Sequence, residues 1–112
     1  MIETTVIEYL GNYVPTYGES PAPPPRSGVY CVVEKTGGGG SAPGIREATL
    51  AVQCFAPTLA AAAQLSENVI AWMRDLALLP GVSRCECNSG YNHTDDRKKQ
   101  PRYQAVFSVV YY

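Results

Sequence analysis

Residues 101–112 alternate between two kinds of side chain, and this pattern constrains the fold more than any other part of the sequence. One set is wholly apolar and comprises Tyr103, Ala105, Phe107, Val109 and Tyr111. The other set is mixed and comprises Gln104, Val106, Ser108, Val110 and Tyr112. A period of two is typical of a β-strand with one buried face. We therefore expect a sheet with one dry face, and we expect residues 1–112 to form one domain that carries the function.

Four other segments favour extended structure. The strand at residues 28–36 has apolar residues on both faces at its centre, so we expect it to be covered on both sides. The remaining expected strands are residues 14–17, 46–56 and 82–88. Residues 37–45 and 89–100 are expected to be the loops of two hairpins, the first with four consecutive glycines.

Helical spacing marks two further segments. A stripe of apolar residues spaced by three and four predicts a long helix over residues 59–79, with Thr58 as N-cap. A shorter pattern predicts an N-terminal helix that Gly11 and Asn12 end. Prolines make residues 20–27 a semi-rigid loop. The predicted class is α+β: a small antiparallel sheet of two hairpins plus a short strand, with the long helix (59–79) and the short N-terminal helix packed on it.

The charge balance argues against several classes of protein. Nine basic and ten acidic residues give a net charge of −1, so no global field attracts nucleic acid or an acidic membrane. No stretch approaches the roughly 20 apolar residues that span a bilayer, and the first residues lack the pattern of a signal peptide. We expect a soluble intracellular protein whose cysteines, Cys31, Cys54, Cys85 and Cys87, are thiols.

The glycine run does not match a nucleotide-binding motif. Gly40 is followed by Ser41-Ala42-Pro43-Gly44, without the lysine that a phosphate-binding loop needs before its helix. The run Gly-Gly-Gly-Gly-Ser also resembles an artificial linker, but the flanking strands are expected to pair across it. We expect a mobile hairpin tip and no bound cofactor.

The polar loop at residues 89–100 holds the only histidine, His93, close to Asp95. These two residues with a serine such as Ser89 or Ser108 could form a hydrolase site, and His93 with Cys85 and Cys87 could form a metal site. The loop offers little to hold such groups in place, and no Cys-x-x-Cys pair is present, so we expect neither an enzyme nor a metal protein. Residues 97–99 are basic and leave a small nucleic-acid-binding module as an alternative.

Edge strands and tyrosines are the best physical indication of assembly. Open edges rich in aromatic and β-branched residues pair with other chains unless they are blocked. The chain also has eight tyrosines, a residue type enriched at protein interfaces, which likewise favours assembly.

Four parts of the sequence resemble the tail terminator (tail-completion) proteins of long-tailed bacteriophages and prophages. They are Val33-Glu-Lys-Thr-Gly-Gly-Gly, Ala48-Thr-Leu-Ala-Val-Gln-Cys-Phe-Ala-Pro, the alanine-rich helix after it, and Pro101-Arg-Tyr-Gln-Ala. The likeness spans nearly the whole chain, although the four glycines depart from the family's usual pattern.

The resemblance implies a structural, non-enzymatic role in the virion, with assembly in the cytoplasm of the bacterial host. Such proteins form a ring, commonly of six copies, that caps the head-proximal end of the tail tube and ends its polymerisation. The implied partners are further copies of the chain, the tail tube protein, the head-closure or connector protein, and DNA that passes through the lumen without specific contacts; no membrane is implied. Another neck, head-closure or minor tail protein is the alternative within this class.

Two expected loop tips are the candidate contacts between subunits or with the tube. The residues are Gly37, Gly38, Gly39, Gly40, Asp95, Asp96, Arg97, Lys98 and Lys99. No catalytic, cofactor-binding or metal-binding residues are expected.

Overall fold

The computed structural model describes residues 2–42, 44–92, 94 and 100–112. Helices and strands follow one another along the chain as α1 (Ile2–Leu10), β1 (Thr16–Tyr17), β2 (Tyr30–Ala42), β3 (Ile45–Phe55), α2 (Leu59–Arg74), a 3₁₀ helix η1 (Asp75–Leu78), β4 (Val82–Asn92) and β5 (Arg102–Tyr111). Two helices and a five-stranded sheet make this an α+β fold, as the sequence predicts.

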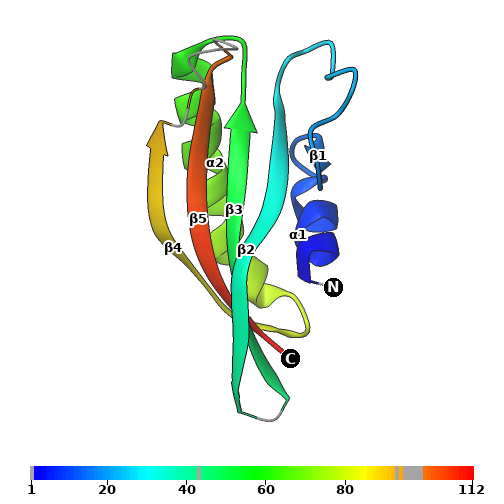
Figure 1. The fold of residues 1–112 in the computed structure, drawn as a ribbon, viewed down its shortest axis with the longest axis vertical. Helices are drawn as coiled ribbons and strands as arrows, with labels where there is room; N and C mark the ends of the chain where they lie inside the picture. Colours follow the sequence, from blue (N-terminus) through cyan, green and yellow to red (C-terminus); the bar gives the residue numbers. More distant parts are fainter. Residues whose placement is uncertain (1, 43, 93, 95–99) are drawn as a thin grey trace.

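The strands lie in the order β1-β2-β3-β5-β4 (Figure 1). Two antiparallel hairpins, β2–β3 and β4–β5, are joined along β3 and β5. The expectation of a wholly antiparallel sheet is wrong at β1, which pairs in parallel with Cys31 and Val32 of β2. The proline-rich segment between β1 and β2 is long enough to bring the chain back in the same direction, which a parallel pair requires.

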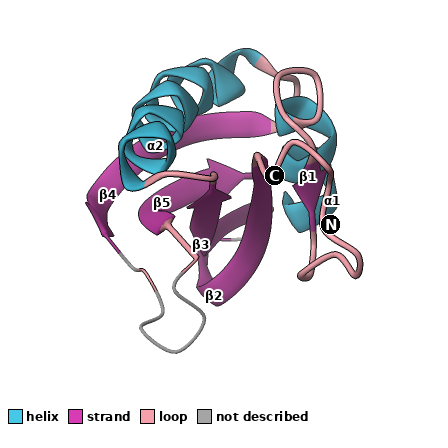
Figure 2. Ribbon diagram, turned by 90° about the horizontal axis from the view of Figure 1, so that it is seen from above, coloured by secondary structure: helices cyan, strands magenta, loops and turns pink. Residues whose placement is uncertain are grey.

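One face of the sheet carries the core. Figure 2 shows α1 and α2 on the same side of the sheet. Strand β5 buries Ala105, Phe107 and Val109 there, and these residues belong to the face predicted from the alternation. Val6 of α1 and Val69 of α2 join the same cluster. The two helices therefore cover a single dry face, as amphipathic helices on a small sheet should.

The opposite face of the sheet is covered at one end only. Tyr30, Val32 and Phe55 form a second buried cluster there, with Tyr17 packed against it. The rings of Tyr30 and Phe55 stack with centroids 4.6 Å apart. Together with buried Cys31 and Val33 on the core side, this confirms that the first part of β2 is covered on both faces.

The long helix is capped and ends as expected, with one difference in geometry. The Thr58 hydroxyl accepts a hydrogen bond from the backbone N–H of Ala61 at 3.1 Å, which satisfies one of the unpaired donors of the first turn. The predicted helix over residues 59–79 is α-helical only to Arg74 and continues as the 3₁₀ helix η1 to Leu78. Gly81, with φ of +88°, then turns the chain into β4.

The helices are also linked to each other. The Tyr9 hydroxyl at the end of α1 donates a hydrogen bond of 2.6 Å to the carbonyl oxygen of Trp72 in α2. Tyr13 stacks on the Trp72 ring with centroids 4.6 Å apart. The pKa of Tyr9 is raised to about 12. Burial of its phenol is the largest cause, and the hydrogen bond with Tyr13 is the next.

Both hairpins are longer than the sequence predicts. The expected loop at residues 37–45 is almost entirely strand, because β2 extends to Ala42 and β3 begins at Ile45. The expected strand at residues 82–88 extends to Asn92. Glycine and small polar residues have low β-propensity. The apolar alternation that predicts a strand therefore ends before the last paired residue of each hairpin.

Replacing Phe107 with alanine tests the importance of the dry face. Phe107 is 1% exposed and lies in the main core, so Phe107→Ala should lower the free energy of unfolding by about 3–5 kcal/mol. Urea denaturation measures the change. Val106→Ala, on the other face of the same strand, is the control and should cost much less. Equal losses for the two variants would contradict the assigned faces.

Candidate functional site

The sheet has two edges that no other described strand covers. On one side, β1 pairs with β2 only at Cys31 and Val32, so no described strand pairs with the outer edge of β2 from Val33 onward. On the other side, β4 pairs with β5 and lies at the end of the sheet. Open strand edges present unpaired N–H and C=O groups that can bind another strand. These edges are therefore the first candidates for a functional surface.

The β2 edge contains three of the glycines predicted as a contact. Gly37, Gly38 and Gly39 pair with residues of β3 on their inner side and are exposed. None of the three has the positive φ that occurs at Gly28, Gly44 and Gly81, so the backbone conformation does not require glycine.

At two of these positions a side chain would also fit without a steric clash. A Cβ at Gly39 would meet nothing within 4 Å, and a Cβ at Gly37 would make ordinary contact with Thr49 at 3.7 Å. Only Gly38 is crowded, since a Cβ there would lie 3.1 Å from the carbonyl oxygen of Glu47. A glycine in a strand often marks a place where another backbone approaches closely.

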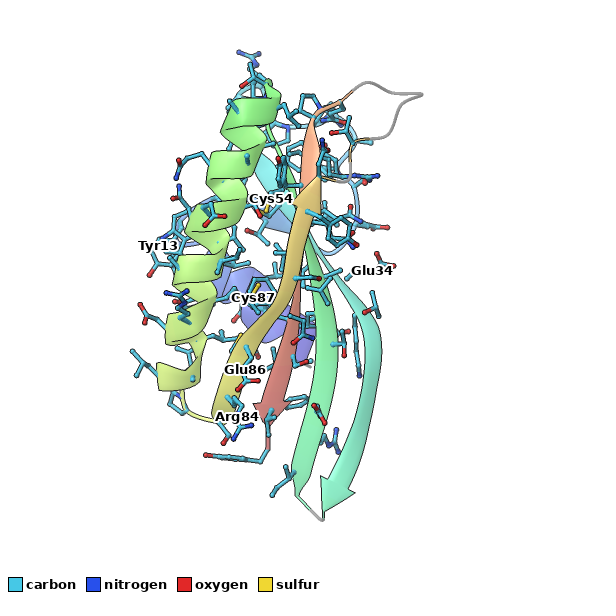
Figure 3. All side chains as sticks on the ribbon, turned by 90° about the vertical axis from the view of Figure 1, so that its left-hand side faces the viewer. Tyr13, Glu34, Cys54, Arg84, Glu86 and Cys87 are labelled. Carbon is cyan, nitrogen blue, oxygen red and sulfur yellow. The ribbon has the colours of Figure 1, made fainter. Side chains whose placement is uncertain are left out.

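The β4 edge is polar and displays charges of both signs. Figure 3 shows Arg84, Glu86 and Cys87 in succession along β4. The Arg84 Nε atom lies 3.8 Å from Glu86 Oε1, and the two side chains are 68% and 62% exposed. A surface ion pair of this kind adds at most about 1 kcal/mol to stability. Its conformation can therefore change easily when another chain approaches.

The two faces of the β4 edge differ. Glu86 pairs with Ser108, on the face away from the helices, and Asn88 donates a hydrogen bond of 2.8 Å to the Ser108 hydroxyl. Cys85 and Cys87 pair with Val109 and Phe107 and so lie on the helix-covered face. The two thiols therefore share a face of the sheet.

The C-terminus lies at the end of the molecule from which the β2–β3 hairpin extends (Figure 1), and several large apolar side chains are exposed there. Leu78 is 82% exposed, Tyr112 is 71% exposed and Ile45 is 42% exposed. The Tyr112 backbone N–H donates a hydrogen bond of 3.0 Å to the Gly81 carbonyl, which places Tyr112 beside the turn that follows Leu78. A groove of about 510 Å³ lies at this end, between the start of α1, the hairpin and Tyr112. Large exposed apolar side chains gathered at one end are typical of a contact surface.

A smaller hollow lies over the second cluster. It has a volume of about 220 Å³ and is lined by Tyr30, Phe55 and Arg102, with prolines of the loop before β2. The Arg102 guanidinium carbon lies 5.6 Å from the Phe55 ring centre, within the range of a cation–π contact. These aromatic side chains are stacked on one another, so we interpret the hollow as the incomplete cover of this cluster.

The four thiols have different environments. The Sγ atoms of Cys31 and Cys54 lie 3.9 Å apart in the core. The hydrogen bond between the Cys54 and Cys31 thiols, followed by burial, raises the pKa of the Cys54 thiol far above its ordinary value. Burial, followed by the nearby Cys87 and Glu86, raises the pKa of Cys85 to about 11. Cys87 is exposed.

The predicted contact residues fall into two groups. Gly37, Gly38, Gly39 and Gly40 lie in β2, and the first three pair with β3, so the expectation that they form a loop is wrong. The charged residues Asp95, Asp96, Arg97, Lys98 and Lys99, and also His93, lie outside the described residues. Sequence reasoning missed the β4 edge; its signal is that residues 83–90 contain no large apolar side chain and carry Arg84 and Glu86, as is typical of an edge strand.

Two other kinds of site are absent from the described residues. No group of three or more histidine, cysteine or acidic side chains in this part of the chain is placed to hold a metal ion. No helix within the described ranges has both the length and the apolar character needed to cross a bilayer.

Thiol modification tests the different environments of the four cysteines. In protein dilute enough to be monomeric, we expect an aromatic disulfide reagent at pH 8 to modify Cys87 first and Cys85 more slowly, because the Cys85 thiolate is scarce below pH 11. Cys31 and Cys54 should react only after unfolding. Absorbance of the released thiol measures the rates, and Cys87→Ser should remove the fast phase. A fast phase that persists in Cys87→Ser would contradict the assignment.

Comparison with known proteins does not assign the chain to a family. No model of a known protein family matches the sequence. No curated protein matches it either.

Proposed function

We propose that the chain is a structural protein of a long-tailed bacteriophage or prophage, which forms a ring and caps the head-proximal end of the tail tube. One observation carries this proposal: the single sheet has two open edges that run in opposite directions. A contact between two different patches of one chain repeats from copy to copy, and it closes into a ring when its rotation permits. The resemblance of nearly the whole sequence to tail terminator proteins supplies the biological setting.

The ends of such a ring would meet its neighbours in the virion. The exposed apolar side chains Leu78, Tyr112 and Ile45, gathered at one end of the molecule, fit a contact with the tail tube protein or the head-closure (connector) protein. The net charge of −1 provides no strong field that would hold DNA in the lumen, which suits DNA that passes without specific contacts. The proposed role contains no chemical step, so the protein acts without catalysis.

Tail length tests the proposal. Deletion of the gene in the phage or prophage that encodes it should give overlong or headless tails in electron micrographs, because tube growth is no longer stopped. Expression of the wild-type protein from a plasmid is the control and should restore normal length. Tails of normal length that fail to join heads would indicate another neck protein instead. Infectious particles of normal appearance would refute a role in the virion.

A further inference from the structure

The open edge of β2 is built for another strand. Residues 34–39 are exposed, and all of them except Thr36 pair with β3 on their inner side. They include Gly37 and Gly39, for which neither φ nor crowding within the chain requires glycine. Edge strands of native proteins are commonly protected by bulges, prolines or long charged side chains. The β2 edge has register shifts between Lys35 and Gly37 and between Gly39 and Ala42, but the stretch between them, Gly37 to Gly39, pairs regularly with β3 and has no side chains. A bare backbone of this kind suits the close approach of a second backbone.

The chain itself offers a strand that fits. Strand β4 runs opposite to β2, because β2, β3, β5 and β4 alternate in direction across the sheet. Rotation about an axis parallel to the strands keeps all strand directions. It therefore places β4 of one copy antiparallel to β2 of the next copy, which is the more stable pairing. The same rotation leaves both helices on the same face of the extended sheet.

We propose that copies of this chain join by antiparallel pairing between the β4 edge of one copy and the β2 edge, residues 34–39, of the next. This interface deepens the ring of the proposed function and rests on it for closure. Strand β1 limits the pairing, because it already occupies the edge at Cys31 and Val32. The occupant is a second copy, since β4 is the other long open edge of the described sheet and β1, at the end beside β2, has only two residues.

The charges and sizes of the side chains favour one register between β4 of one copy and β2 of the next. When Gly39 lies opposite Arg84 and Gly37 opposite Glu86, the two long side chains lie over positions that have none. In the same register Glu34 lies opposite Ser89, so no like charges meet directly. A register that brings Glu34 opposite Glu86 would instead place two carboxylates together. The glycines thus provide room for the charged pair of the neighbouring copy.

A lysine on the β2 edge tests the interface in solution. Gly39→Lys should abolish self-association and leave the 12.1 kDa monomer, because the new side chain blocks the edge and lies opposite Arg84. Ala71→Lys, on the exposed side of α2, adds the same charge elsewhere and should assemble like the wild type. Light scattering over a range of concentrations measures the mass, and circular dichroism checks that both variants are folded. A monomeric wild type, or an assembled Gly39→Lys variant, would overturn the proposal.

Cross-linking tests which edges meet. Lys35 pairs with Leu50 and Glu34 with Ala51, so these neighbours lie on the helix-covered face and the opposite face respectively. Side chains on adjacent strands meet only when they share a face. Lys35→Cys should therefore form disulfides with Cys85 or Cys87 of the next copy on mild oxidation, giving a ladder of oligomers in a non-reducing gel. Glu34→Cys, on the same strand but the other face, is the matched control and should give none.

Other cross-linking patterns would refute the interface. A dimer of the wild type linked through Cys85 or Cys87 of both copies would show that β4 pairs with β4 across a two-fold axis. The absence of a ladder in Lys35→Cys, or a ladder of equal yield in Glu34→Cys, would also overturn the pairing. Mass spectrometry of the linked peptides identifies the cysteines.

The interface and the proposed function can fail separately. If Lys35→Cys forms the ladder but deletion of the gene leaves tails unchanged, the interface holds and the role in the tail is wrong. If deletion gives overlong tails and Gly39→Lys restores them as well as the wild type does, the role holds and the interface is wrong.

Discussion

The pairing of β3 with β5 is the interaction on which the rest of the structure depends. It runs in unbroken register from Arg46 opposite Tyr111 to Phe55 opposite Arg102 and joins two hairpins that are far apart in the sequence. An isolated hairpin is at best marginally stable in water, so each hairpin needs the other. The central pair presents Leu50 and Phe107 side by side as a platform for the helices. Because β3 and β5 occupy the centre, the outer edges of β2 and β4 are left open.

The sequence predicts the elements that carry strong periodic patterns. Phe107 and its neighbours at every second position bury one face of β5, and the alanine-rich helix begins after Thr58, because these segments obey local rules of strand alternation and helix capping. The burial of both faces of β2 at Tyr30 and Cys31 is also visible in its apolar run. Local chemistry decides these features, so one sequence is enough to find them.

Features that depend on residues far apart in the sequence cannot be predicted from local sequence patterns. Gly37 to Gly39 pair with β3 although glycine disfavours strands, because the hairpin continues beyond the last apolar residue. Strand β1 is only Thr16 and Tyr17, and its parallel direction follows from the path of the loop after it. The β4 edge is recognisable as a surface only when the strand order is known. The candidate site therefore emerges from topology, whereas the glycine run alone suggests a loop.

The central register also has a consequence for how the chain folds. Leu50 and Phe107 meet only after the whole of α2 and β4 has been synthesised between them, and closing so long a loop costs entropy before any contact repays it. Until β5 arrives, β3 has an open inner edge and the β2–β3 hairpin is exposed on both sides. Early α2 formation shortens the loop, since a helix forms from local contacts. Pairing between the hairpins of two unfinished chains is thus the reaction that competes with folding. The N-cap at Thr58 favours early formation of α2 and so reduces the time during which this pairing can occur.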